Sequence, residues 1–194
     1  MTSKSMHISL PDVLRQFVEK QTDREGYSGK SDYIQALIRE EMKKKEIERL
    51  KNMLLQGLAS GRKEYTENEW QAFQGEILKS VGAWFMKFSL TKEAETDIKE
   101  IVGYLAQESP QAARNFLKEF TKACTHLAEM PQMAQKAPEE ITETIPILSD
   151  CRRWPLRRFS SHLVFYKPER EGILVLRVVN GKRDLPVLFG SWEY

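Results

Sequence analysis

The sequence predicts an α+β protein with two folded parts that meet near residues 79–89. Two parts are expected because a strand-like alternation followed by helical spacing occurs twice, once from Ser5 and again from Met86. A sheet is expected in the second part, because strand-like runs follow one another only between Arg152 and Val179. We therefore expect a small domain at 1–60, a helical segment with the junction at 61–85, and a second domain at 86–194.

The composition is that of an ordinary globular protein, with 41% apolar and 30% charged residues in a chain of 194. No apolar run reaches the length of a membrane span, and the first residues lack an apolar signal core. The two cysteines, Cys124 and Cys151, are too few for a disulfide scaffold or a zinc site. We therefore expect a cytoplasmic protein with no membrane partner, metal or other cofactor.

The net charge of +2 is distributed unevenly along the chain. Residues 86–150 carry seven Lys and Arg against eleven Asp and Glu, whereas residues 151–194 carry nine against four. A positively charged face is therefore expected toward the end of the chain.

The first part is predicted to contain one strand and two helices. Residues 5–10 alternate polar and apolar side chains, which is the period of a half-buried strand. Pro11 suits the first position of a helix, and residues 34–42 have the spacing of a second helix after a turn rich in Gly and Ser. A lone strand cannot satisfy its own edges. We therefore expect it to pair with the same strand of a second copy, which makes a dimer with a two-stranded antiparallel ribbon.

A helical tail is predicted to follow. Its first stretch carries an apolar stripe at helical spacing over residues 47–58, and Gly57 and Gly61 are expected to loosen the chain there. Thr66 and Glu69 form a capping-box signature before a last helix. A domain as small as the first part offers no obvious core against which this helix could pack. An amphipathic helix without a core is typically laid into a partner's groove. The expected contact residues are Leu54, Leu58, Trp70, Phe73, Ile77 and Val81.

The second part is predicted to begin with a strand at 86–90 and a helix from Thr91. Ser109 and Pro110 suit the N-cap and first position of a second helix, whose buried face includes Cys124. His162 is expected in an exposed turn of the sheet region. The expected strands are 152–159, 162–167 and 173–179, the last of them central because its start is apolar on both faces, with a short fourth strand at 185–189.

The stretches SMHISLPDVLRQFVEKQ and GYSGKSDYIQALIREE resemble the ribbon-helix-helix antitoxins of the ParD family, over nearly all of residues 3–60. This resemblance implies that the outward strand face enters the major groove of operator DNA. The start of the second helix would then hold a phosphate of the DNA backbone. Gln35 stands where an Arg is common in the family. The implied DNA-binding residues are Lys4, Ser5, His7, Ser9, Ser28, Gly29 and Lys30.

The stretch KFSLTKEAETDIKEIVGYLAQESPQAARNFL and the ending RVVNGKRDLP resemble the ParE branch of the RelE/ParE toxin superfamily, over essentially residues 86–190. The resemblance implies a helical hairpin packed on an antiparallel sheet. It also implies that the toxin poisons DNA gyrase by binding, because ParE-like relatives lack the residue set with which RelE-like relatives cut messenger RNA on the ribosome. Asn180 stands where the family often has a His.

The sheet region is rich in arginine and poor in groups suited to proton transfer, so we expect no catalytic residue. Arginines of this region either bind the target or support the sheet, and Arg183 and Asp184 are candidates for a supporting ion pair. The candidates for target binding are Arg157, Arg177, Arg183 and Trp192.

These observations predict a fused toxin–antitoxin protein. Its first part would dimerise, bind operator DNA and neutralise the second part, which would inhibit DNA gyrase when freed. One alternative is a ribosome-dependent endoribonuclease in the second part, with Arg157 and Tyr194 as the residues to test. Another is a DNA-binding repressor whose second part is inactive.

Overall fold

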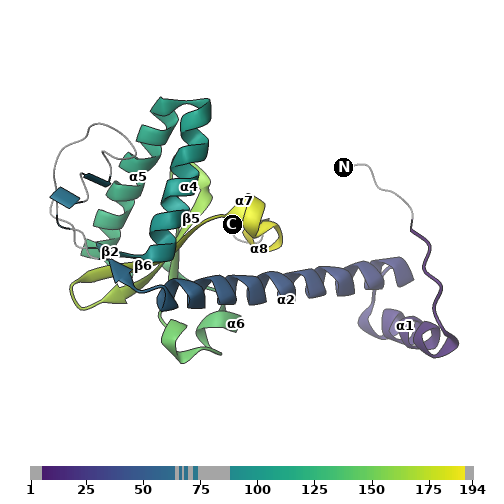
Figure 1. Ribbon diagram of the computed structural model, residues 1–194. Coiled ribbons are helices and arrows are strands. Elements are labelled where there is room, and N and C mark those ends of the chain that lie inside the picture. The colour runs from purple at the N-terminus through teal and green to yellow at the C-terminus, as the bar shows by residue number, and fades with distance from the viewer. Residues whose placement is uncertain (1–5, 64–65, 67, 70–71, 74–87, 191–194) are drawn as a thin grey trace. The chain divides into compact units, whose positions relative to one another are not determined.

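The computed structural model describes residues 6–63, 66, 68–69, 72–73 and 88–190. The chain forms two compact units, residues 1–45 and residues 46–194, and each is described by itself. Helices make up the first unit, and a sheet with helices makes up the second (Figure 1), so the protein is α+β. Over the described residues, every helix is too short or too polar to cross a membrane.

The first unit contains α1 (Asp12–Glu25) and the beginning of α2 (Lys30–Ala59). Pro11 lies immediately before α1, and Gly26 ends it in the left-handed conformation with φ 73°, which a residue without a side chain adopts most readily. The rings of Tyr27 and Tyr33 meet edge to face at 5.3 Å between centroids. Residues 6–10, predicted as a strand that pairs with a second copy, form no strand in this single chain.

The first unit leaves many large apolar side chains in contact with solvent. On α1, for example, Leu14 is 51% exposed and Phe17 is 52% exposed. So extensive an exposed apolar surface is typical of a protein–protein contact. The exposed large apolar residues of this unit are Met6, Ile8, Val13, Leu14, Phe17, Leu37, Ile38 and Met42.

The second unit is built on a six-stranded sheet with the order β1-β2-β6-β5-β4-β3. Its neighbouring strands are antiparallel except β2 and β6, which are parallel because two helices connect β2 to the later strands. The apolar strand β6 is central, as the sequence predicts. The strands are β1 (Arg62–Lys63), β2 (Phe88–Thr91), β3 (Gln135–Lys136), β4 (Arg152–Leu156), β5 (Phe159–Glu169) and β6 (Gly172–Asn180).

A helical hairpin of α4 (Lys92–Glu108) and α5 (Pro110–Glu129) covers one face of the sheet (Figure 1). Both helices start where the sequence predicts. The hydroxyl of Thr91 accepts a hydrogen bond from the Ala94 N–H, and the hydroxyl of Ser109 accepts one from the Ala112 N–H, each at 3.2 Å. Cys124 of α5 is fully buried in the core between hairpin and sheet, which also contains Phe116 and Phe120.

A second core lies on the opposite face of the sheet. Alternate side chains of β5 and β6 divide between the two cores: Val164 and Val175 enter the first, and Leu163 and Leu174 enter the second. The second core is covered by residues 46–59 of α2, by α6 (Glu139–Thr142) and by the 3₁₀ turn η1 (Pro146–Leu148). The long proline-rich loop of the sequence therefore contains short elements that help to close this core.

Two sequence-based expectations about local structure are wrong. Residues 185–189 form no strand, because α7 (Gly181–Asp184) and α8 (Pro186–Gly190) are short helices there. Leu185 and Leu188 are buried three residues apart, a spacing that suits a helical turn better than a strand. Gly57 does not loosen the chain, since α2 continues through it to Ala59, and only Gly61, with φ 83°, stands after the end of the helix.

Candidate functional site

The second half of α2 is packed against the sheet face opposite the helical hairpin. Leu50 and Leu54 are fully buried, and Ile47 is buried beside them, because spacings of three and four residues place these side chains on one side of the helix. Met53, Leu55 and Leu58 widen the contact at its margins. The sheet and the C-terminal turn meet this stripe with Leu163, Phe165, Leu174, Leu176, Val179, Leu185 and Leu188.

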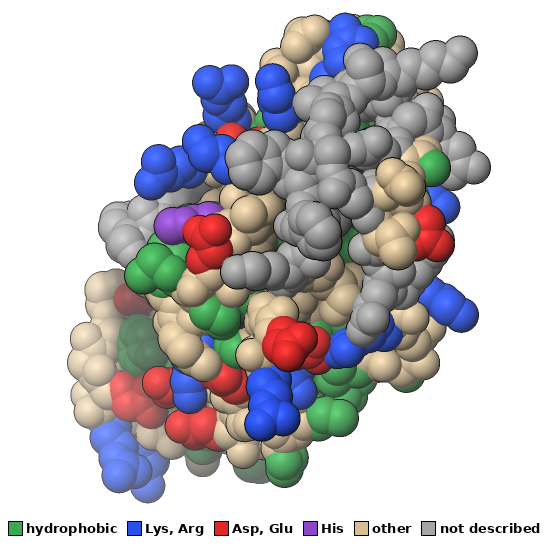
Figure 2. All heavy atoms as spheres, turned by 90° about the vertical axis from the view of Figure 1, so that its left-hand side faces the viewer, with side chains coloured by type: hydrophobic (Ala, Val, Ile, Leu, Met, Phe, Trp, Pro, Cys, Tyr) green, Lys and Arg blue, Asp and Glu red, His purple; other side chains and the backbone are tan. Residues whose placement is uncertain are grey.

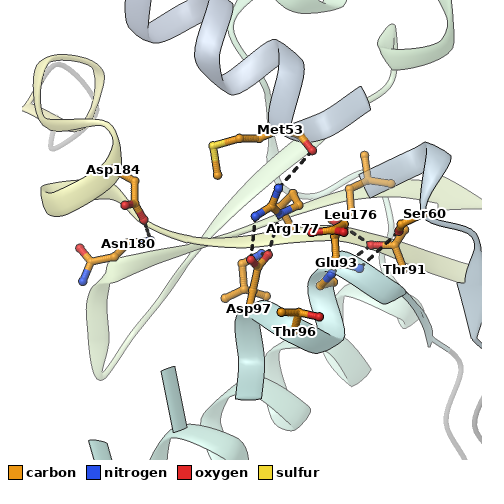
Figure 3. A network of polar contacts seen from close by, with 12 residues as sticks. Met53, Ser60, Thr91, Glu93, Thr96, Asp97, Leu176, Arg177, Asn180 and Asp184 are labelled. Atoms are coloured by element: carbon orange, nitrogen blue, oxygen red, sulfur yellow. Dashed lines mark hydrogen bonds and ion pairs between the residues drawn. The ribbon is translucent and has the colours of Figure 1, made fainter. Parts of the chain in front are cut away.

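A buried ion pair lies at the edge of this contact. Arg177 of β6 donates from Nε and Nη2 to the two carboxylate oxygens of Asp97 on α4, each at 2.8 Å (Figure 3). Its Nη1 donates to the carbonyl oxygen of Met53 on α2 at 3.4 Å. Burial opposes the charge of Arg177, but the hydrogen bonds and charge of Asp97 outweigh it and raise the pKa of the guanidinium. One side chain thus connects α2, β6 and α4.

Two charged residues of α2 contact the short helices near the C-terminal end of the same unit. The carboxylate of Glu46 accepts hydrogen bonds from the backbone N–H groups of Val187 and Leu188 at 3.0–3.1 Å. Arg49 donates to the carbonyl oxygen of Asp184 at 3.2 Å. These contacts bring α2 to both α7 and α8, because Asp184 is the last residue of the first and Val187 lies in the first turn of the second.

The chain after α2 adds a strand to the sheet. In β1, Arg62 pairs with Thr91 and Lys63 with Leu90, antiparallel to the edge of β2. The hydroxyl of Ser60 accepts a hydrogen bond from the Glu93 N–H at 3.3 Å (Figure 3). A strand added to an open edge is one of the recurring ways in which a peptide segment binds a domain. Residues 46–63 therefore pack against the rest of the second unit through a helix and a strand together.

A cavity of about 460 Å³ lies beside the ion pair. It is lined from α2 by Arg49, from α4 by Asp97, Glu100 and Tyr104, from β5 by His162, and from β6 and α7 by Arg177, Asn180 and Arg183, among others. Its cationic and anionic side chains are similar in number, so the cavity has no dominant charge.

His162 is not the exposed turn residue that the sequence suggests. It lies inside β5 and is only 9% exposed, because its ring packs edge to face against Phe116 at 5.4 Å and Phe159 at 6.3 Å between centroids. Burial is the main reason why the pKa of His162 lies below the usual histidine value. The ring is thus packed mainly by aromatic neighbours, and the small part that remains accessible lines the cavity.

Stability should depend on pH through His162. In the unfolded chain this ring binds a proton as the pH falls through about 6.5, whereas the folded protein resists protonation until a lower pH. The stability of the wild type, relative to His162→Gln, should therefore be greatest well above that pH and decline as the pH falls through about 6.5 toward the lower pKa of the folded protein. Denaturant unfolding of both proteins across this range measures the difference. If the difference in unfolding free energy between the two proteins did not change with pH, the lowered pKa of His162 would be contradicted.

Five of the predicted DNA-binding residues lie within the part of the chain that the structure describes. His7, Ser9 and Ser28 are exposed, and the hydroxyl of Ser28 donates to the Asp32 carboxylate at 3.0 Å. Lys30, at the start of α2, forms an ion pair with Glu19 of α1, so its charge is partly neutralised. Gly29 has open space around its Cα. Lys4 and Ser5 lie outside the described residues.

Among the predicted contact residues, Leu54 is buried under α2 and Leu58 is half-buried against the same core. Phe73 is buried in the other core, below the helical hairpin, with Lys99 Nζ 5.4 Å from its ring centroid. Trp70, Ile77 and Val81 lie outside the described residues. Thr66 and Glu69 make the predicted capping box, because the Thr66 N–H donates to the Glu69 carboxylate and the Glu69 N–H to the Thr66 hydroxyl.

Sequence reasoning missed other residues of this contact. In the sequence, Glu46 and Arg49 look like part of an exposed, charged helix face. Gly57 looks like a glycine that ends or loosens the helix. Leu50 carried a usable signal, since it belongs to the same apolar stripe as Leu54, but the stripe alone does not say what it covers.

Of the predicted target-binding arginines, Arg177 and Arg183 line the same cavity but differ in exposure. Arg177 is 12% exposed and is held by Asp97, whereas Arg183 is 72% exposed and forms an ion pair with the adjacent Asp184. Arg157 is exposed between β4 and β5, and Trp192 lies outside the described residues. Figure 2 shows one face of the molecule, on which acidic side chains lie among the basic ones. As far as it is described, this face is therefore not the uniformly basic surface that binding to a phosphate backbone favours.

The fold and the covered face define a small α+β domain, a helical hairpin on a mixed sheet, to which the helical tail of a preceding part is bound. Residues 88–185 match the family described as the ParE toxin of the type II toxin-antitoxin system parDE, and the chain belongs to this family. Its N-terminal part is similar to Antitoxin ParD4 of Caulobacter vibrioides, with 36% identity over 69 residues, which is 35% of this chain and 72% of that protein. The chain is thus a ParD-like antitoxin fused to a ParE toxin. We refer to residues 1–63 as the antitoxin half and to residues 88–190 as the toxin half.

Proposed function

We propose that this chain is a self-neutralised toxin. Its antitoxin half dimerises through a ribbon-helix-helix, binds operator DNA, and keeps the toxin half silent by covering it with residues 46–63. The toxin half, when freed, inhibits DNA gyrase by binding and not by catalysis. The observation that carries this proposal is the burial of Leu50 and Leu54 against the toxin half's sheet.

The covering segment belongs to the antitoxin side of the fusion, since it precedes the family match at residues 88–185. It hides an apolar sheet face and engages Arg177, one of the candidates for target binding. A short connection between the two halves gives the segment a high effective concentration at its own toxin half, so that dissociation is rapidly reversed. We propose that, in a dimer, the segment covers either its own toxin half or that of the dimer mate.

Dimerisation is supported by the first unit, whose large apolar side chains are exposed in the single chain. Pairing of the two residue 5–10 segments would satisfy their edges and bring these side chains together. The DNA-binding face of the ribbon would then be formed by His7 and Ser9 with their neighbours, beside the starts of the two α2 helices.

Phe17→Asp should convert the dimer into a monomer, because a carboxylate at the centre of a dimer contact must lose its water without gaining a partner. Sedimentation velocity of the full chain measures the change in mass. Gln16→Asp is the matched control, since it adds the same charge at the adjacent exposed position of α1. A Phe17→Asp protein that remains dimeric would show that the copies associate elsewhere.

Binding by the toxin half is favoured over RNA cleavage by the state of His162, which lines the cavity but is only 9% exposed. General acid–base cleavage requires a proton-transfer group within reach of the substrate. The remaining polar groups around the cavity are mainly arginines and carboxylates held in ion pairs.

The proposal is tested by inducing residues 86–194 alone in bacteria, against the full chain, and by assaying gyrase supercoiling with each purified protein. Toxicity and loss of supercoiling with the fragment only are the expected results. Co-expression of residues 1–85 should reverse the toxicity, and addition of purified residues 1–85 should restore supercoiling. Toxicity with normal supercoiling would instead indicate RNA cleavage. A well-folded fragment without toxicity would leave a DNA-binding repressor with an inactive second half.

A further inference from the structure

Gly57 lies where α2 passes close to the backbone of β6. A Cβ atom placed on this residue would stand 2.5 Å from the carbonyl oxygen of Leu176 in β6, and 3.3 Å from its carbonyl carbon. Contacts as short as 2.5 Å do not occur for real Cβ atoms, so either the helix or the strand would have to move. Gly57 itself is buried within a helix, a position in which glycine is less favourable than alanine.

The Leu176 carbonyl is not free to move away. It accepts a hydrogen bond from the Thr91 hydroxyl at 2.8 Å, and this hydroxyl also caps α4 (Figure 3). Strand β6 lies between β2 and β5, so its backbone is held on both sides. The next residue, Arg177, is fixed by its two hydrogen bonds to Asp97.

A bulge in β6 explains why this carbonyl is so close to the helix. Arg177 pairs with Phe165 and Val175 pairs with Tyr166, which leaves Leu176 as an extra residue without a partner position on β5. A bulge of this kind re-aims the backbone and shifts the alternation of side chains by one residue. Accordingly, Val178 rather than Arg177 joins the core below the helical hairpin.

We propose that Gly57 is the specificity-determining residue of the contact between the two halves. The toxin half accepts an amphipathic helix that has no side chain at the position of Gly57, where the helix passes over the Leu176 carbonyl. The helix must also carry leucines three and seven residues before that position, as Leu54 and Leu50 do here. A helix with the same apolar stripe but a Cβ at that position is excluded by the fixed backbone of β6. This inference rests on the proposed neutralising role of residues 46–63 and names the feature by which the toxin half selects its own antitoxin.

Hydrogen exchange of the full-length Gly57→Ala protein tests the inference. We expect the amides of residues 46–59 to exchange at least about tenfold faster than in the wild type, because α2 no longer docks. The amides of α4 and α5 should keep their protection, since the core below the hairpin contains no residue of α2. Alanine by itself stabilises a helix relative to glycine, so faster exchange of α2 in this variant would have to arise from loss of docking and not from a weaker helix.

Gly103→Ala is the matched control. Gly103 also lies inside a helix, α4, but a Cβ there would meet nothing within 4 Å. The control should therefore leave the exchange of residues 46–59 unchanged. Unchanged protection of α2 in Gly57→Ala would overturn the inference, and so would an equal loss of protection throughout the toxin half, which would make Gly57 a general stability residue.

Growth of bacteria that express Gly57→Ala separates this inference from the proposed function. Faster exchange of α2 together with growth arrest supports both. Faster exchange with normal growth supports the role of Gly57 in docking and counts against the toxicity of the freed half. Unchanged exchange overturns the inference whatever the growth.

Discussion

Leu54→Asp is expected to release α2 from the toxin half and to make the full-length protein toxic. Leu54 is fully buried among Leu50, Leu174 and other side chains of the second core. Truncation of a buried leucine to alanine typically costs about 2–5 kcal/mol, and a carboxylate at such a site also loses its hydration without a partner. The contact between α2 and the sheet cannot compensate for a loss of this size. The helix should therefore undock, while the core below the helical hairpin remains intact.

Asn52→Asp is the control for this prediction. It places the same charge on the same helix only two residues away, at an exposed position. Growth on induction and hydrogen exchange of the purified full chain should both distinguish the two variants. If Leu54→Asp exposes α2 to exchange without affecting growth, the toxin half has no toxic activity under those conditions. If α2 remains protected, the apolar stripe is not what holds it.

The toxin half was largely predictable because its elements carry local signals. Thr91 and Ser109 cap helices at the positions where a hydroxyl-bearing residue precedes an apolar period, and Pro110 starts the second of them. The central position of β6 follows from a run that is apolar on both faces. These signals act over a few residues, so a single sequence reveals them.

The site was less predictable because it depends on contacts between distant residues. The stripe that contains Leu50 and Leu54 indicates a buried helix face, but the sheet that buries it lies more than a hundred residues further along the chain. The predicted strand at 185–189 failed because three alternating apolar residues do not distinguish a strand from a helical turn. His162 was misjudged because polar neighbours suggested a turn, whereas Phe116 of a distant helix buries its ring.

The role of Arg177 shows the same limit most clearly. Its sequence context, in an arginine-rich stretch, leaves two roles open, namely binding of the target and support of the sheet. In the folded protein its planar guanidinium matches the two oxygens of Asp97, and both side chains are only about a tenth exposed. An arginine that completes such a pair is part of the support of the sheet. Its contact with the Met53 carbonyl makes it, in addition, part of the surface that the antitoxin half covers.

Asp97→Ala is expected to be among the most destabilising substitutions in the toxin half. Removal of this carboxylate leaves the buried Arg177 without its ion-pair partner and the Val178 N–H without the acceptor that Asp97 provides at 2.9 Å. Loss of one member of a buried ion pair costs about 3–5 kcal/mol, because the remaining charge is uncompensated. Denaturant unfolding of the full chain, followed by a signal from the toxin half, measures the loss. Arg183→Ala is the control, since that arginine is 72% exposed and its ion pair with Asp184 should contribute about 1 kcal/mol or less.

The double variant Asp97→Ala with Arg177→Met separates the pair from its surroundings. If the large cost of Asp97→Ala arises from the unpaired guanidinium, replacing Arg177 with an apolar side chain of similar length should restore much of the stability. The Val178 N–H remains without that acceptor in both variants, so the part that is not restored measures its contribution. Arg177→Met alone should loosen α2 as well, because the Met53 carbonyl loses its donor. Equal destabilisation by Asp97→Ala and by the double variant would show that the carboxylate acts through the β6 backbone and not through Arg177.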